Sequence, residues 1–196
     1  MPVLPQTLLN ENTSSRRRDA LVLLGASLVG LPAHASDAAH LLLRQGGCAV
    51  LLRHARTEAG IGDPPGFTLG QCTTQRNLSE AGRADARRIG RWFAERWLVP
   101  AEIKSSAWCR CTETADLAFR RHTVWPVLNS TFGDRLQQPD QTGLVRAALA
   151  ALPADRFEVW VTHQVNITAL TGEVPAMGEA FIVDRQGKIR LRTTFA

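Results

Sequence analysis

Short apolar runs that end abruptly in polar or charged residues recur along this chain. Ala49 to Leu52 is apolar without alternation and stops at Arg53-His54. Such a run predicts a strand that is buried on both faces, which is how strands of parallel sheets read in sequence. Two further segments, around 102–105 and over 157–162, are expected to form core strands as well. The pattern therefore indicates a sheet whose central strands are covered on both sides.

Elsewhere the apolar positions recur every three or four residues. From Ser79, a good N-cap, this spacing predicts a helix that runs to about Trp97, ahead of Pro100. Further helices are expected over 112–119, 142–152 and 166–171. A strand is expected over 123–128, near a sheet edge because of Pro126, and a hairpin over 180–183 and 189–192. Strands that alternate with helices favour one α/β domain with a mostly parallel sheet.

Basic side chains follow each of the three predicted core strands. Arg53-His54, Arg110 and His163 all stand at or after a strand end. The carboxyl ends of parallel strands meet at one rim, so we expect these side chains to lie together. Guanidinium groups bind phosphate by paired hydrogen bonds, and a neutral imidazole is a nucleophile. The alternative for each residue alone is an ordinary solvated charge at the end of a strand.

The segment after His54 is a long loop. Residues 57–75 contain repeated glycines and an Asp-Pro-Pro-Gly turn. A long loop in a compact domain is usually functional or disordered, and this one is expected to form a rim of the pocket. A metal is the competing use of the two histidines, but neighbouring guanidiniums repel a cation and no carboxylate completes a ligand set, so none is expected. Without a glycine-rich P-loop, nucleotide-driven chemistry is not expected either.

Residues 1–35 have the pattern of an export signal. Arg16-Arg17-Arg18 precedes an apolar stretch from Ala20 to Leu31, and Ala33-His34-Ala35 offers a cleavage site before Ser36. The stretch is too short to span a bilayer as a stable helix. Arg17-Arg18 favours the twin-arginine route over the general secretory route. We therefore expect a periplasmic protein whose mature domain is 36–196, with no membrane span.

The charge of the chain bears on its partners. The formal net charge is +5, and nearly all of the positive charge is arginine, since Lys104 and Lys188 are the only lysines. Arginine suits planar contacts with phosphate, although a coding bias would give the same composition. No basic run follows residue 18, and aromatic residues do not interleave with basic ones, so nucleic acid is not an expected partner. The sequence does not indicate an oligomeric state.

Four segments together resemble the histidine phosphatase superfamily, which has the phosphoglycerate mutase-like fold. They are Leu-Leu-Arg-His-Ala (51–55) and the segments 74–83, 105–115 and 161–172. The resemblance is to small exported members and implies a three-layer α/β/α architecture without a metal or organic cofactor. It implies that His54 accepts the phosphoryl group, that Arg53, Arg110 and His163 hold it, and that Thr57 adds a contact.

The chain departs from the family pattern at two points. Ala55 stands where glycine is usual, a change that is tolerated unless the position needs a positive φ. Many members carry a glutamate as proton donor downstream of the second arginine, where this chain has Asn129-Ser130. The nearest acids are Asp134 and, in the first loop, Glu58 and Asp63. We keep these three as candidate proton donors.

The predicted function is an exported phosphatase that hydrolyses a phosphomonoester or a phosphohistidine through a phosphohistidine at His54. Its partner would be a small phosphorylated substrate or a phosphate group of the cell envelope. A non-catalytic periplasmic protein that binds phosphate or phosphosugar is the main alternative, favoured by Ala55 and the unassigned acid. A mutase is less favoured because the chain is short, and a structural protein because four segments match.

The cysteines offer a test of export and of the site together. Cys72 lies in the first loop, and Cys109 and Cys111 flank Arg110. If both segments line one pocket, an oxidising compartment permits a bond between Cys72 and one of that pair. Cys111 begins a face of small residues that a helix packs against a sheet, so Cys109 is the expected partner. Free thiols are the alternative.

Overall fold

The computed structural model describes residues 32–195. The predicted export signal lies outside the described residues except for positions 32–35. These four positions open helix α1 (Pro32–Gln45), so the predicted cleavage before Ser36 falls inside this helix. Within the described range, no helix has the length and apolar character needed to cross a membrane.

One six-stranded sheet organises the fold, with the strand order β3-β2-β4-β1-β5-β6. The strands are β1 (Cys48–Arg53), β2 (Ile103–Ser105), β3 (Thr123–Val124), β4 (Phe157–Thr162), β5 (Glu179–Asp184) and β6 (Ile189–Thr194). The first four run parallel to one another, whereas β5 pairs antiparallel with both β1 and β6. The α/β class is confirmed, but the expectation of a mostly parallel sheet is wrong. The hairpin of β5 and β6 was predicted. The pairing of β5 with β1 was not.

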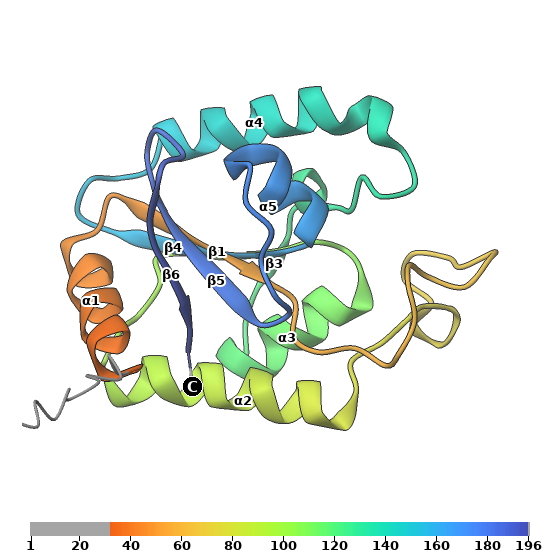
Figure 1. Ribbon diagram of the computed structural model, residues 1–196, viewed down its shortest axis with the longest axis horizontal. Helices are drawn as coiled ribbons and strands as arrows, with labels where there is room; N and C mark the ends of the chain where they lie inside the picture. Colours follow the sequence, from red (N-terminus) through yellow and green to blue (C-terminus); the bar gives the residue numbers. More distant parts are fainter. Residues whose placement is uncertain (1–31, 196) are drawn as a thin grey trace, which may run out of the picture. The chain divides into compact units, whose positions relative to one another are not determined.

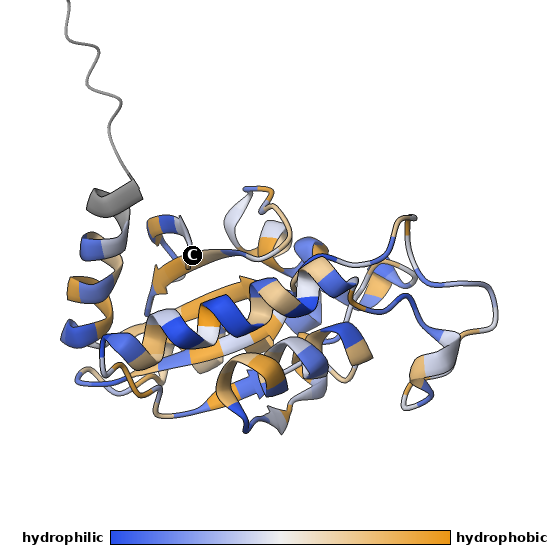
Figure 2. Cartoon of the chain, turned by 90° about the horizontal axis from the view of Figure 1, so that it is seen from below, coloured by the Kyte–Doolittle hydropathy of each residue, from blue (hydrophilic) through white to orange (hydrophobic). Residues whose placement is uncertain are grey.

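Helices cover both faces of this sheet (Figure 1). One apolar core lies between the sheet and helices α1, α2 (Glu80–Glu95) and α3 (Cys109–Phe119). A second core lies between the other face and helices α4 (Gln138–Ala150) and α5 (Gln164–Thr171). The central strands β1 and β4 are buried almost throughout, and Figure 2 shows their apolar colouring between helices of mixed colour. The predicted three-layer arrangement is therefore present.

The predicted helices and strands differ from the structure mainly at their ends. Ser79 caps α2 as expected, since its hydroxyl accepts a hydrogen bond from the backbone N–H of Gly82. Helices α3 and α4 begin earlier than predicted, at Cys109 and Gln138. The strand predicted over 123–128 is wrong beyond Val124, because Pro126 opens a 3-10 turn there. Helix α1 was not predicted, since its amino-terminal turn overlaps the predicted signal.

The loop after β1 projects beyond the end of the sheet and is fastened at its base (Figure 1). Thr57 forms a bridge with Leu78, and the carbonyl of Arg56 accepts a hydrogen bond from the backbone N–H of Ser79. Gly82 lies so close to the same carbonyl that a Cβ at this position would overlap its oxygen. Only glycine permits this approach, which brings the start of α2 against the segment that follows His54.

Candidate active site

The four basic residues that follow the core strands meet in one cavity of about 740 Å³. Arg53 and His54 come from the end of β1, His163 from the end of β4, and Arg110 from the first turn of α3. The rings of His54 and His163 lie 5.6 Å apart, edge to face. The prediction that these side chains come together is thus confirmed in their placement, while their chemical roles stay predictions.

The backbone around His54 is held by three elements. Its N–H donates to the carbonyl of Thr162 in β4, its carbonyl accepts from Gly178, and the N–H of Ala55 donates to Thr114 Oγ1 in α3. Ala55 is not among the residues with positive φ, so alanine replaces the usual glycine there without strain. The imidazole is therefore presented on a rigid platform.

The protonation state of His54 follows from its contacts. Its Nδ1 lies 2.9 Å from the carbonyl oxygen of Ala55, and because a carbonyl can only accept, Nδ1 carries the hydrogen. The lone pair is then on Nε2. Burial, which is the largest cause, and the positive charges of Arg110, Arg53 and Arg76 together lower the pKa of His54 to about 3, against the opposing bond to Ala55. The ring is neutral, and Nε2 has the character of a nucleophile.

Three arginines of the cavity have donors to spare. Within residues 32–195, the buried guanidinium nitrogens that lack a hydrogen-bond partner are the Nε atoms of Arg53, Arg76 and Arg110. Burial lowers the pKa of Arg53 and of Arg76. The charges of Arg76 and Arg110 lower the pKa of Arg53 further, and the charge of Arg110 lowers that of Arg76 against the opposing charge of Asp63. An oxyanion would pair with the free donors and relieve the repulsion, so the cavity is suited to a phosphoryl group.

His163 is fixed as the opposite tautomer to His54. Its Nδ1 lies 3.4 Å from a guanidinium nitrogen of Arg110, which can only donate, so the hydrogen is on Nε2. Nε2 donates to Ser106 Oγ at 2.8 Å, and that hydroxyl donates to Asn129 Oδ1 at 3.3 Å. Burial, followed by the charge of Arg110, lowers the pKa of His163 well below its usual value.

Asp63, one of the candidate proton donors, is bound to Arg110, which is predicted to hold phosphate. Its carboxylate accepts from Arg110 at 2.7 Å, from the indole N–H of Trp108 at 3.0 Å and from the backbone N–H of Arg76 at 3.0 Å. Burial raises the pKa of Asp63, but these bonds outweigh it and hold the pKa below the ordinary value. In this conformation the carboxylate is ionised and orients Arg110.

The other candidate residues differ in their access to the cavity. Asp134 lines the cavity and caps a 3-10 turn by accepting from the backbone N–H of Leu136. Glu58 is exposed and is not among the residues that line the cavity. Thr57 is buried and does not line the cavity. Its hydroxyl accepts from Arg76 at 2.6 Å, so Thr57 is linked to the cavity through Arg76.

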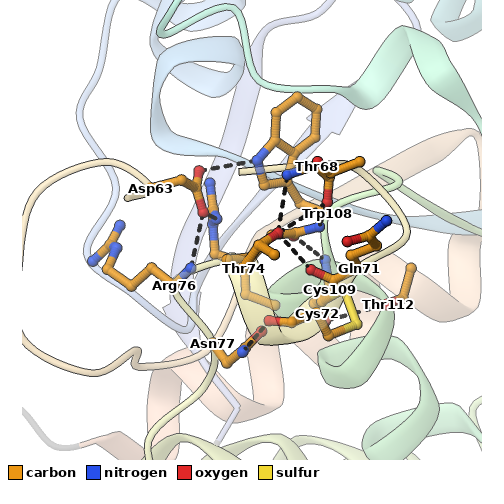
Figure 3. Close-up of a disulfide and its surroundings, with 12 residues drawn as sticks. Asp63, Thr68, Gln71, Cys72, Thr74, Arg76, Asn77, Trp108, Cys109 and Thr112 are labelled. Atoms are coloured by element: carbon orange, nitrogen blue, oxygen red, sulfur yellow. Dashed lines mark hydrogen bonds and ion pairs between the residues drawn. A yellow bond between two sulfur atoms is a disulfide. The ribbon is translucent and has the colours of Figure 1, made fainter. Parts of the chain in front are cut away.

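A disulfide joins the first loop to α3, as predicted (Figure 3). Cys72 is bonded to Cys109, while Cys48 and Cys111 are free and buried. Gln75 strengthens the junction by accepting from the backbone N–H of Cys109 at 3.0 Å. Because Cys109 precedes Arg110, the bond fixes the loop next to Arg110.

Arg76 is the cavity residue that sequence reasoning missed. It lies inside the matched segment 74–83, and the signal was an arginine in the loop just before the N-cap of α2. Its guanidinium donates to both the hydroxyl of Thr57 and the carbonyl of Gly60.

The described residues contain no group of three histidine, cysteine or acidic side chains placed to hold a metal ion.

The fold and the site define an α/β protein with two buried histidines among arginines at the carboxyl ends of the central strands. A family model for the histidine phosphatase superfamily (branch 1) matches residues 49–177. Because this match covers more than half of the 196 residues, the chain belongs to the histidine phosphatase superfamily. Among curated proteins, no sequence matches this chain significantly.

Several solved structures share the fold. A phosphoglycerate mutase from Thermus thermophilus has 20% identity and a TM-score of 0.53, with 75% of this chain and 98% of that chain covered. The Rv3214 open reading frame of Mycobacterium tuberculosis has 17% identity and a TM-score of 0.54, with 76% and 98% covered. The protein histidine phosphatase SixA complexed with tungstate has 17% identity and a TM-score of 0.51, with 76% and 97% covered. At these identities the likeness concerns the fold, which is phosphoglycerate mutase-like.

Proposed function

We propose that this protein is a phosphatase that hydrolyses phosphate monoesters through a phosphohistidine formed on His54. The observation that carries the proposal is a neutral imidazole whose Nε2 lone pair is free, in a cavity where three guanidiniums have unpaired donors. A nucleophile and a binding site for the charge that builds on phosphorus are the two requirements of phosphoryl transfer to a side chain.

The reaction has two steps. In the first, His54 Nε2 attacks phosphorus, a nitrogen–phosphorus bond forms, and the bond from phosphorus to the leaving oxygen breaks. Arg53, Arg76 and Arg110 hold the equatorial oxygens, whose charge they stabilise as it builds in the transition state. In the second step a water molecule attacks the phosphohistidine, inorganic phosphate leaves, and the neutral imidazole returns.

The leaving oxygen needs a proton, and the acids of the cavity differ in their access to it. Asp63 is ionised while it binds Arg110. Asp134 lines the cavity and is exposed, so it is the remaining carboxyl group with access to a leaving group. Solvent is the other source of the proton. A reaction without a buried acid proceeds best with a leaving group that tolerates negative charge.

We propose that catalysis needs no metal or organic cofactor. The guanidiniums of Arg53, Arg76 and Arg110 supply the positive charge that a metal ion would bring to a phosphoryl group. Activity should therefore survive extensive treatment with EDTA. Loss of activity on chelation, followed by recovery on adding Zn²⁺ or Mg²⁺, would contradict this part of the proposal.

The experiment that tests the function is a panel of phosphate monoesters and a phosphohistidine peptide, assayed with the purified mature chain. Turnover should be abolished in His54→Ala, and acid-labile phosphate should be trapped on the wild-type protein at His54. Turnover by His54→Ala at a rate near that of the wild type would overturn the mechanism.

The second candidate function is a non-catalytic phosphate-binding protein. The observation that favours it is the engagement of Asp63 by Arg110, which leaves the site without a buried proton donor. The two functions differ in one result. A binding protein would bind inorganic phosphate equally well in the wild type and in His54→Ala, and would give neither turnover nor labelled protein.

We also propose that the protein belongs to a small exported branch of the superfamily and acts in the periplasm. The support is the sequence of residues 1–35, with its arginines and apolar stretch, and a disulfide that an oxidising compartment permits. Cell fractionation, with a cytoplasmic marker enzyme as control, tests the location. The pair substitution of Arg17 and Arg18 by lysine should block export if the twin-arginine route is used.

A further inference from the structure

The cavity has two unlike parts. Its floor is the charged set of Arg53, His54, Arg110 and His163 at the strand ends, where a phosphoryl group would bind. Its upper wall is contributed by two loops, 60–67 and 130–135, together with Met177 and residues that follow the strands. A volume of about 740 Å³ is in the range of sites for whole organic ligands, and a phosphoryl group fills a small part of it.

Six of the side chains that line the cavity outside the floor are large and apolar, and four of them are exposed. These six, Ile61, Phe67, Trp108, Phe132, Val165 and Met177, are called the apolar wall, and they lie among the polar residues Asp63, Arg76, Ser130, Asp134, Arg135 and Gln164. Ile61 is 91% exposed and Phe132 53%, although large apolar side chains are normally covered. Exposed apolar groups that gather around a pocket mark a surface that a ligand covers.

Contacts with neighbouring residues hold the apolar side chains of the wall in place. The ring of Phe67 lies 5.9 Å from that of Trp108, and Trp108 is itself held by its hydrogen bond to Asp63. Phe132 packs beside Gly62, where a Cβ would lie 3.6 Å from Phe132 Cε1. The first loop is also fixed by the disulfide to α3. The apolar groups are therefore presented next to the phosphate-binding floor in a fixed arrangement.

We propose that the site selects phosphate monoesters whose leaving group is apolar and at least as large as a phenyl ring. This inference rests on the proposed function and specifies its substrate class. A sugar or a polar peptide would leave the apolar wall in water and would gain little from it. An apolar group would cover the wall while its phosphate occupies the floor. Aromatic and aliphatic groups share this chemistry, and the experiment separates them.

The test is a series of straight-chain alkyl phosphates from ethyl to octyl, whose leaving groups have nearly the same acidity. The value of kcat/KM should rise by roughly two- to fourfold for each added methylene until the wall is covered. Glycerol phosphate, whose leaving group is also an alcohol, should fall below octyl phosphate. In a second arm, naphthyl and phenyl phosphate show whether a flat aromatic group is preferred to a chain. A flat or falling alkyl series would overturn the proposal.

Variants test whether the preference for long alkyl groups depends on the apolar wall. Phe132→Ala should reduce the ratio of octyl to ethyl phosphate kcat/KM by roughly tenfold. Leu136→Ala is the matched control, because Leu136 is 92% exposed in the 3-10 turn that follows this loop and does not line the cavity. Its ratio should equal that of the wild type. An unchanged ratio in Phe132→Ala would contradict the assignment of this wall.

A binding measurement keeps this inference separate from catalysis. Octylphosphonate cannot be hydrolysed and should raise the melting temperature of the wild type more than methylphosphonate does at the same concentration. If no ester is turned over but octylphosphonate is still preferred, the phosphatase proposal fails and the apolar selection stands. If esters are hydrolysed and the two phosphonates stabilise equally, the apolar selection fails alone.

Discussion

Arg110 is bound to Asp63 and to His163, and its buried Nε has no hydrogen-bond partner. A guanidinium can make several contacts at once because its donors lie in one rigid plane. The same side chain thus orients an imidazole and holds the first loop, and in the proposed reaction it would also bind phosphate.

Arg110→Lys should therefore lower kcat/KM by about a hundredfold, since a lysine keeps the charge but loses the fork that reaches Asp63 and the ligand together. Steady-state kinetics with any accepted phosphate monoester measures this. Arg83→Lys is the control, because Arg83 pairs with Glu113 away from the cavity, and its kinetics should match the wild type. If Arg110→Lys kept most of the kcat/KM, the positive charge at this position would be sufficient for activity without the guanidinium fork.

His54 gives a prediction about pH and stability. Its pKa is about 3 in the folded chain against 6.5 ordinarily, so between these values the unfolded chain binds more protons. The free energy of unfolding should therefore be fully retained above pH 6.5 and should fall as the pH drops towards 3. Urea denaturation of the wild type and of His54→Gln at a series of pH values measures this. The variant should lose less stability on acidification, and the two curves should run parallel above pH 6.5. Identical slopes throughout would show that His54 is not held neutral.

At the scale of elements, the carboxyl end of helix α2 has a backbone conformation that its own residue does not favour. Helix α2 closes with the N–H of Trp97 bonded to the carbonyl of Ala94, and the N–H of Leu98 bonded to that of Phe93. This closure needs a residue in the left-handed conformation, and Trp97 adopts that conformation with φ 54°. Trp97 is 88% exposed. Glycine is the residue that favours this conformation.

Trp97→Gly should raise the free energy of unfolding by about 0.5–1 kcal/mol, because it removes the left-handed strain and gives up little burial. Arg96→Gly is the matched control one position earlier, where φ is −103° and the guanidinium stacks on Trp92. That variant should lose stability. Denaturant titration of both proteins measures the difference, and a destabilised Trp97→Gly would indicate that the indole makes contacts that stabilise the domain.

The disulfide joins an irregular loop to a helix and gives the next prediction. It closes a chain segment of 37 residues, for which the chain-entropy model gives about 3–4 kcal/mol of stabilisation. The double variant Cys72→Ser, Cys109→Ser should be less stable by up to this amount. Its kcat/KM should also fall, because the loop carries Asp63 and the apolar wall. A reductant should lower the stability and the kcat/KM of the wild type and should change neither in the double variant. Full activity in the double variant would show that the loop is held without the bond.

The sequence predicted the elements whose pattern is local, and it missed what depends on distant pairing. Strand β1 is apolar up to Arg53, and β4 is apolar apart from Glu158 and its last residue, Thr162. Ser79 caps α2 by its own side chain. These elements were therefore predictable. The antiparallel pairing of β5 with β1 was not, since strand neighbours are chosen by tertiary contacts. Arg76 was missed for the same reason, because its role depends on a loop that folds back towards Thr57.

At the scale of the whole molecule, the order of the strands brings the functional residues together. Strands β1 and β4 are neighbours although they are far apart in sequence, and this places His54 beside His163. Strand β2 pairs with β4 and leads into α3, which adds Arg110. Every residue of the charged floor therefore depends on the central strands, while the apolar wall depends on the loops.

The two outermost strands of this sheet have a consequence for how the protein meets other chains. Strand β3 pairs over two residues before Pro126 ends it, and β6 carries arginines at 190 and 192 on its less buried positions. Short strands, proline and positive charge at an edge oppose the addition of a strand from another polypeptide. The sheet is thereby protected from edge-to-edge aggregation, and peptides are not expected to bind this protein by extending its sheet.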